Sequence, residues 1–129
     1  MKNLTYVMEN YLEAIYELSK EKSFARTSDI AEKLNVSKAS VNSAMQTLIN
    51  KGLITSEKYR EIYLTEEGKK IAEFTSKKHK TIKNFFTGVL GVDDGTADSD
   101  ACAIEHVISQ NSVKAMDSFL KKTGSKKPE

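Results

Sequence analysis

The sequence predicts a mainly α-helical chain, with an N-terminal winged helix-turn-helix followed by further helices. Two observations support this fold class. Apolar residues recur at helical spacing along most of the 129 residues, and a short pair of strand-forming segments follows the third helical stretch. The hydrophobic fraction of 39% is large enough for a packed core, and the single cysteine excludes an internal disulfide.

The first amphipathic helix is predicted over residues 5–20. Its apolar stripe consists of Leu4, Met8, Leu12, Ile15 and Leu18, which recur at the helical period. Glutamates interrupt this stretch, so it lacks the continuous apolar block of a signal peptide, and no run approaches the ~20 residues that span a bilayer. We therefore expect a cytoplasmic protein with no membrane partner.

Residues 27–51 carry the helix-turn-helix pattern. Thr27 or Ser28 is expected to cap the first short helix, and the turn falls at Asn35–Val36. Ser37 is expected to cap the second helix, over 38–51, and Gly52 suits the position after its end.

A β-hairpin is predicted directly after this unit, which makes it winged. Leu53–Ile54 and Ile62–Leu64 are rich in strand formers, and residues 58–60 form the polar turn between them. Thr65 then caps a long helix over 66–87.

The C-terminal part is predicted to hold a Gly- and Asp-rich loop and two helices. Asp98 or Ser99 is expected to cap a helix over 100–110, and Asn111 or Ser112 a helix over 112–122. The remaining residues, 123–129, are expected to be a disordered tail.

The helix-turn-helix and wing indicate that the chain binds double-stranded DNA. The net charge is only +2 and the pI about 8.5, but residues 37–60 alone carry +3. Small polar side chains at the start of the second helix suit base edges and phosphates. The expected DNA contacts are Arg26, Thr27, Ser37, Lys38, Ala39, Ser40, Asn42, Ser43, Lys58 and Arg60.

The pentapeptide Cys102-Ala-Ile-Glu-His106 concentrates soft and ionisable side chains. On a helix, Cys102, Glu105 and His106 share one face, and their donor atoms suit a divalent transition metal such as Fe²⁺, Co²⁺, Ni²⁺ or Zn²⁺. Three ligands from one turn do not close a coordination sphere. Further donors could come from His79, the only other histidine, and from Asn10 and Glu13, which are three residues apart on the first helix.

A nucleophilic cysteine is the enzymatic alternative for this pentapeptide. His106 is one turn from Cys102, but no Gly-rich elbow or preceding strand supplies an oxyanion site. We therefore expect no enzymatic activity and no small-molecule substrate.

Together these segments resemble the diphtheria-toxin-repressor family of metal-dependent transcriptional repressors. The resemblance covers residues 5–122 and rests on ENYLEAIYEL, ARTSDIAEKLNVSKASV, KGLI, YREIYLTEEGKKIA and CAIEH; the family's SH3-like domain is expected to be absent. It implies a winged-helix domain over 1–70 and a helical metal-binding and dimerisation domain over 71–122. It also implies a homodimer on a pseudo-palindromic operator that controls metal-ion homeostasis. The implied metal ligands are Asn10, Glu13, His79, Cys102, Glu105 and His106.

Several departures from the family pattern bear on the metal. Asn10 stands where Asp or Met is usual, and Lys83 and Asp98 stand where an ancillary site has Glu and His. Cys102 resembles the iron-responsive branch, whereas the short chain resembles the manganese-responsive one. A soft thiolate disfavours Mn²⁺, so we expect Fe²⁺ before Mn²⁺, with Zn²⁺, Co²⁺ or Ni²⁺ binding in vitro. A metal-independent winged-helix regulator and a redox sensor that uses Cys102 are the remaining alternatives.

Overall fold

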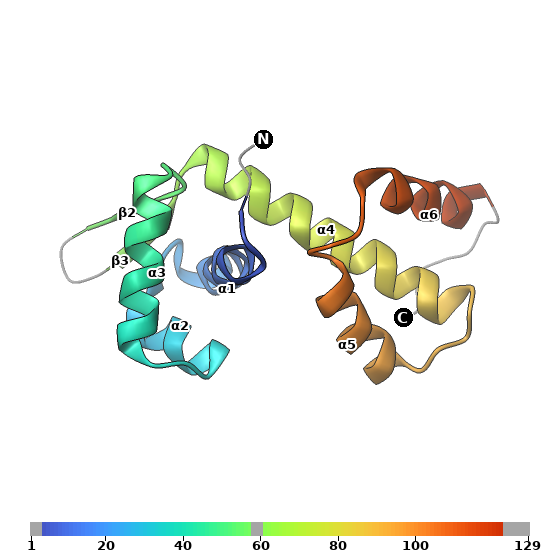
Figure 1. The fold of residues 1–129 in the computed structure, drawn as a ribbon, viewed down its shortest axis with the longest axis horizontal. Coiled ribbons are helices and arrows are strands. Elements are labelled where there is room, and N and C mark those ends of the chain that lie inside the picture. The colour runs from blue at the N-terminus through green and yellow to red at the C-terminus, as the bar shows by residue number, and fades with distance from the viewer. Residues whose placement is uncertain (1–3, 58–60, 123–129) are drawn as a thin grey trace. The chain divides into compact units, whose positions relative to one another are not determined.

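A computed structural model describes residues 4–57 and 61–122 of the chain. The chain divides into two compact units, residues 1–74 and 75–129. The elements in order are α1 (Tyr6–Lys22), β1 (Ala25–Arg26), α2 (Thr27–Leu34), α3 (Lys38–Asn50), β2 (Ile54–Ser56), β3 (Glu61–Leu64), α4 (Glu66–Gly88), α5 (Asp94–Ile104) and α6 (Gln110–Lys122) (Figure 1). The predicted class is confirmed: a winged helix-turn-helix followed by helices.

Helix α1 begins and ends with local signals that the sequence carries. The side-chain oxygen of Thr5 accepts a hydrogen bond from the backbone N–H of Met8 at 3.1 Å, which satisfies one of the unpaired donors of the first turn. The helix ends at Ser23, which adopts a left-handed conformation with φ of 72°. Its inner face holds the buried residues Tyr11, Leu12, Ala14 and Ile15.

The N-cap predicted for α2 was wrong. Arg26, not Thr27 or Ser28, is the capping residue, and no side chain caps this helix end. The reason is that Ala25 and Arg26 are extended and pair with Ile62 and Glu61 of β3, so the chain passes directly from a strand into the helix. The two-residue strand β1 is too short for a period-2 pattern to reveal it.

Helix α3 has both of its predicted ends. Ser37 caps it, and its side-chain oxygen accepts from the backbone N–H of Ser40 at 3.1 Å. At the other end Gly52 has a φ of 75°, which glycine adopts without steric cost. The N–H of Gly52 donates to Ile49 and the N–H of Leu53 donates to Leu48, the two bonds of a Schellman motif.

The wing is a small antiparallel sheet with strand order β1-β3-β2. Ile54 pairs with Leu64 and Ser56 with Ile62, as the predicted hairpin requires. The predicted turn at 58–60 lies outside the described residues. Ile54 and Ile62 turn inward and are almost fully buried.

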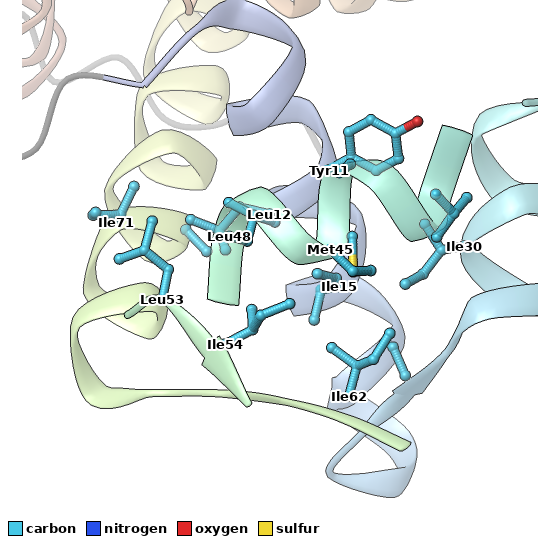
Figure 2. Close-up of a cluster of buried hydrophobic side chains, with 14 of the residues drawn as sticks. Tyr11, Leu12, Ile15, Ile30, Met45, Leu48, Leu53, Ile54, Ile62 and Ile71 are labelled. Carbon is cyan, nitrogen blue, oxygen red and sulfur yellow. The ribbon is translucent and has the colours of Figure 1, made fainter. Parts of the chain in front are cut away.

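The core of the first unit joins the three helices to this sheet. Leu12 and Ile15 from α1, Leu48 from α3 and Ile62 from β3 are each at most 2% exposed and belong to one cluster (Figure 2). Ile30 of α2 is also fully buried in it. Full burial of such side chains contributes about 1.5–3 kcal/mol each, so this cluster fixes α3 against its supports.

Two residues hold the start of α4 against the end of the helix-turn-helix. The hydroxyl of Thr65 donates to the carbonyl of Gly52 at 2.8 Å and accepts from the N–H of Gly68 at 3.1 Å. Gly68 lies so close to the backbone of Leu53 that an added Cβ would be 2.0 Å from its carbonyl oxygen. The absence of a side chain at Gly68 is therefore a packing requirement.

The second unit differs from the prediction in its helix bounds. The segment predicted as a loop is the start of α5, because Asp93 caps it by accepting from the N–H of Thr96 at 2.9 Å. Ala97 and Ala101 are its buried stripe, and the helix ends at Ile104 rather than 110. Helix α6 starts two residues earlier than expected, because Ser109 accepts from the N–H of Ser112 at 3.1 Å.

Both of these helices contact α4. Phe85 of α4 and Phe119 of α6 meet edge to face, with ring centroids 5.9 Å apart, while His79 of α4 contacts α5 (Figure 1). Among the described residues, no helix has the length and apolar character needed to cross a membrane. The predicted tail, 123–129, lies outside the described residues.

Candidate metal centre and DNA-reading surface

The centre of the candidate metal site is a contact between α4 and the residues that follow α5. Nδ1 of His79 lies 2.8 Å from Oε1 of Glu105, and Nε2 of the same ring lies 2.9 Å from Oδ1 of Asp98. His79 is in the middle of α4, and Asp98 is on α5. Both nitrogens of one imidazole therefore face carboxylates from the neighbouring segment.

Glu105 is the most deeply placed member of this group. Its side chain is 0% exposed, and its second oxygen, Oε2, lies 3.3 Å from Nε2 of His106. Within the described residues, Oε2 accepts no hydrogen bond. A buried carboxylate oxygen without a hydrogen bond is costly, so a positive charge bound at this position would stabilise it.

The electrostatics of the group are strongly coupled. The hydrogen bond to Glu105 is the main cause that raises the pKa of His79 from 6.5 to about 9; burial opposes this, and Asp98 adds to it. The hydrogen bond to His79 is in turn the main cause that lowers the pKa of Asp98. A cation is thus favoured at this point of the second unit, as imidazolium or as a metal ion.

The donor set fits a divalent transition metal. Two imidazoles and a buried carboxylate are borderline donors, whereas calcium and magnesium sites are built from oxygen alone. A metal at this position would replace the proton on Nδ1 of His79 and take the second oxygen of Glu105. The residues of this unit therefore supply an incomplete but suitable ligand set.

The structure separates the remaining predicted ligands from this description. Cys102 is on α5 and exposed, although it belongs to the same pentapeptide as the buried Glu105. Because α5 ends at Ile104, the three pentapeptide side chains are not carried by one uninterrupted helix as expected. Asn10 and Glu13 are both half-buried on α1 of the first unit. The role of these three residues as ligands remains a prediction.

Sequence reasoning missed the group formed by Lys83, Asp94 and Asp98. The ammonium of Lys83 lies 3.5 Å from Oδ2 of Asp94 and 3.6 Å from Oδ1 of Asp98. His79 and Lys83 are four residues apart on α4, and Asp94 and Asp98 are four apart on α5. That matched spacing was the available signal, but it was hidden because residues 94–98 were predicted as loop.

The DNA-reading surface predicted on α3 is exposed. Ser37, Lys38, Ala39, Ser40, Asn42 and Ser43 are all exposed, while the intervening Val41 is fully buried. This alternation means that α3 is anchored by its apolar side and presents its first two turns outward. The hydroxyls of Ser37 and Ser40 also bond to each other at 3.0 Å.

The other predicted DNA contacts differ among themselves. Arg26 is half-exposed, 3.6 Å from Glu61, and its guanidinium lies 5.4 Å from the ring centre of Phe24. Thr27 is only 6% exposed, so its side chain offers little surface to a ligand. Lys58 and Arg60 lie outside the described residues.

Both units match known families. Residues 3–62 match the family described as iron dependent repressor, N-terminal DNA binding domain, and residues 65–127 match the iron dependent repressor, metal binding and dimerisation domain. The chain is 42% identical over 106 residues to the HTH-type transcriptional regulator MntR of Bacillus velezensis and to that of Bacillus subtilis. Each match covers 82% of this chain and 74% of the relative.

Solved structures agree. The manganese regulator SloR is 31% identical, with a TM-score of 0.78 over 88% of this chain, and ScaR with bound Zn²⁺ is 28% identical, with a TM-score of 0.77 over 88%. The chain spans about half of each of these structures, 53%. The chain therefore belongs to the iron-dependent repressor family, the metal-dependent DNA-binding transcriptional regulators whose N-terminal domain binds operator DNA and whose C-terminal domain binds metal and forms the dimer.

Proposed function

We propose that this chain represses genes of metal-ion homeostasis by binding a pseudo-palindromic operator as a homodimer when a divalent transition metal is bound. The observation that carries the proposal is the buried Glu105 carboxylate, which faces two imidazoles and leaves one oxygen without a hydrogen bond. Operator DNA is found in the cytoplasm, so we place the protein there.

The proposed ligand set includes residues of both units. His79, Glu105 and His106 of the second unit are joined by Cys102 in the same pentapeptide and by Asn10 and Glu13 of α1. The support for Asn10 and Glu13 is their i, i+3 spacing, their partial burial and the resemblance to the family. Metal shared between α1 and the second unit would favour one arrangement of the recognition helices, provided that it binds that arrangement more tightly.

Two metals are the candidates, and Cys102 distinguishes them. A thiolate ligand favours Fe²⁺ over Mn²⁺, which is our sequence-based expectation. The exposure of Cys102 and the oxygen and nitrogen donors of Glu105, His79 and His106 favour Mn²⁺ instead. The relative SloR is a manganese regulator by name, which supports the second candidate.

The metal is tested by anaerobic binding titrations of Fe²⁺ and Mn²⁺ with the wild-type protein and Cys102→Ala. If Cys102 is a ligand, the substitution weakens Fe²⁺ binding and changes the spectrum of a Co²⁺-substituted protein. If affinities and spectrum stay the same, the thiolate is not a ligand and the manganese candidate stands. Ser99→Ala, an exposed position on the same helix, is the matched control.

The DNA half of the proposal is tested by selecting bound duplexes from a random pool in the presence of Fe²⁺ or Mn²⁺. We expect two inverted half-sites whose centres are about one helical turn of DNA, ~10 bp, or a multiple apart. Enrichment of a single unrepeated half-site would contradict the dimeric reading of the operator.

A further inference from the structure

The contact between His79 and Asp98 has a specific chemical consequence. In the structure the two ring nitrogens of His79 have different partners: Nδ1 faces Glu105 and Nε2 faces Asp98. Glu105 belongs to the proposed ligand set and Asp98 does not. The ring is therefore oriented with Nδ1 toward the metal position and Nε2 away from it.

A histidine that binds metal through one nitrogen can carry a proton only on the other. Such histidines generally donate that second N–H to a carboxylate, a carbonyl or water, and this bond fixes both the tautomer and the ring orientation. Oδ1 of Asp98, 2.9 Å from Nε2, is placed to accept it. Asp98 is more than half exposed, so its own position is not fixed by burial.

Lys83 supplies the missing constraint on Asp98. Its ammonium, one turn along α4 from His79, lies 3.6 Å from Oδ1 of Asp98 and 3.5 Å from Oδ2 of Asp94. Asp94 and Asp98 are one turn apart on α5, so the ammonium joins two carboxylates of one helix to the helix that carries His79. The result is a chain of contacts from Lys83 through Asp98 and His79 to Glu105.

We propose that Asp98 is a positioning residue that accepts the Nε2–H of His79 and so presents Nδ1 to the metal, and that Lys83 holds Asp98 in place for this role. The inference rests on the proposed metal site. It goes beyond that site because neither Asp98 nor Lys83 is among its predicted ligands. It also assigns the ammonium a structural role between two carboxylates that could otherwise attract a second cation.

The test combines metal affinity with the tautomer of His79. Asp98→Ala should weaken Mn²⁺ and Zn²⁺ binding by about 10–100-fold, the usual effect of losing an outer partner of a ligating histidine. Nitrogen-15 spectra of the Zn²⁺-loaded protein should show His79 protonated at Nε2 in the wild type. They should show a mixture of ring states in Asp98→Ala. Only His79 and His106 contribute to these spectra.

Three further variants make the result decisive. Asp98→Glu, which keeps a carboxylate, should recover part of the affinity, and Lys83→Met should lose less than Asp98→Ala because the bond to His79 remains. Asp100→Ala, an exposed position two residues further along α5, should bind metal like the wild type. Wild-type affinity and tautomer in Asp98→Ala would overturn the proposal.

The stoichiometry separates this proposal from other failures. If the wild type binds two ions per chain and Asp98→Ala binds one, Asp98 is itself a ligand and the positioning role is wrong. If Glu105→Gln also leaves metal binding unchanged, the proposed site as a whole is misplaced. Loss of binding in Glu105→Gln with no change in Asp98→Ala rejects only the present inference.

Discussion

Nδ1 of His79 lies 2.8 Å from Oε1 of Glu105, and this contact joins the middle of α4 to the segment after α5. It brings together two residues that are 26 positions apart in the sequence. Because Glu105 is fully buried, the pair is a fixed element of the second unit. The predictions for the metal site depend on it.

Glu105→Gln should remove most metal binding while leaving the helical fold intact. The amide keeps one oxygen but loses the charge, and its nitrogen cannot coordinate a metal. We expect a loss of at least about 100-fold in Mn²⁺ or Fe²⁺ affinity, beyond the ~10–100-fold typical of outer partners. Titration calorimetry measures it, with Glu73→Gln, an exposed glutamate on α4, as the control. Binding equal to the wild type would remove Glu105 from the site.

The metal-free protein should lose stability as the pH rises from about 6.5 to 9. The pKa of His79 is about 9 in the folded chain, against an ordinary value of 6.5, chiefly because of its hydrogen bond to Glu105. A group with a raised folded-state pKa contributes fully below the unfolded value and loses its contribution as the pH passes the folded value. Urea unfolding at a fixed protein concentration measures this.

The matched variant for that pH dependence is His79→Gln, which cannot titrate. The difference in unfolding free energy between wild type and variant should shrink between pH 6.5 and 9. A difference that stays constant over this range would show that the His79–Glu105 contact does not contribute in the charged form.

Gly68→Ala should destabilise the first unit by about 1–3 kcal/mol, the usual range for overpacking. The added Cβ would lie 2.0 Å from the carbonyl oxygen of Leu53, a backbone atom that cannot rotate away. Gly88→Ala is the control, since nothing lies within 4 Å of its Cβ position at the end of α4. There the same change should stabilise by about 0.5–1 kcal/mol. Thermal unfolding compares them; equal effects at the two positions would contradict the packing argument.

Lys38→Ala should weaken DNA binding to all sequences by a similar factor. Lys38 is the first residue of α3 and is exposed, so it is placed to contact a phosphate. Losing one such contact lowers the slope of log affinity against log salt by about 1. Lys114→Ala, an exposed lysine on α6, should leave the slope unchanged. An unchanged slope in Lys38→Ala would exclude this residue from the interface.

Much of the first unit could be predicted because its signals are local. The cap at Ser37, the stop at Gly52 and the apolar stripe with Val41 and Leu48 each act within one helix. Strand β1 could not be predicted in this way, because its two residues are extended only through pairing with β3. Its presence also changed which residue caps α2.

The second unit was harder because composition misled the assignment of α5. Asp93, Gly95 and Asp98 are typical of loops, yet Asp93 caps a helix and Ala97 and Ala101 form its buried stripe. His79, Glu105 and His106 were predicted as a group, and they do lie together. The exposure of Cys102 and the contact of Lys83 with Asp98 depend on where α5 begins and ends, which no local pattern specified.

The most direct test of the account is the affinity of the dimer for its selected operator with and without metal. Fluorescence anisotropy would follow labelled duplex with the wild type and Glu105→Gln, in chelator and in saturating Mn²⁺ or Fe²⁺. We predict that metal raises the affinity of the wild type by about 5–150-fold, the usual range of allosteric coupling, and leaves Glu105→Gln unchanged. Equal wild-type affinity in chelator and in both metals would contradict the claim that metal controls DNA binding.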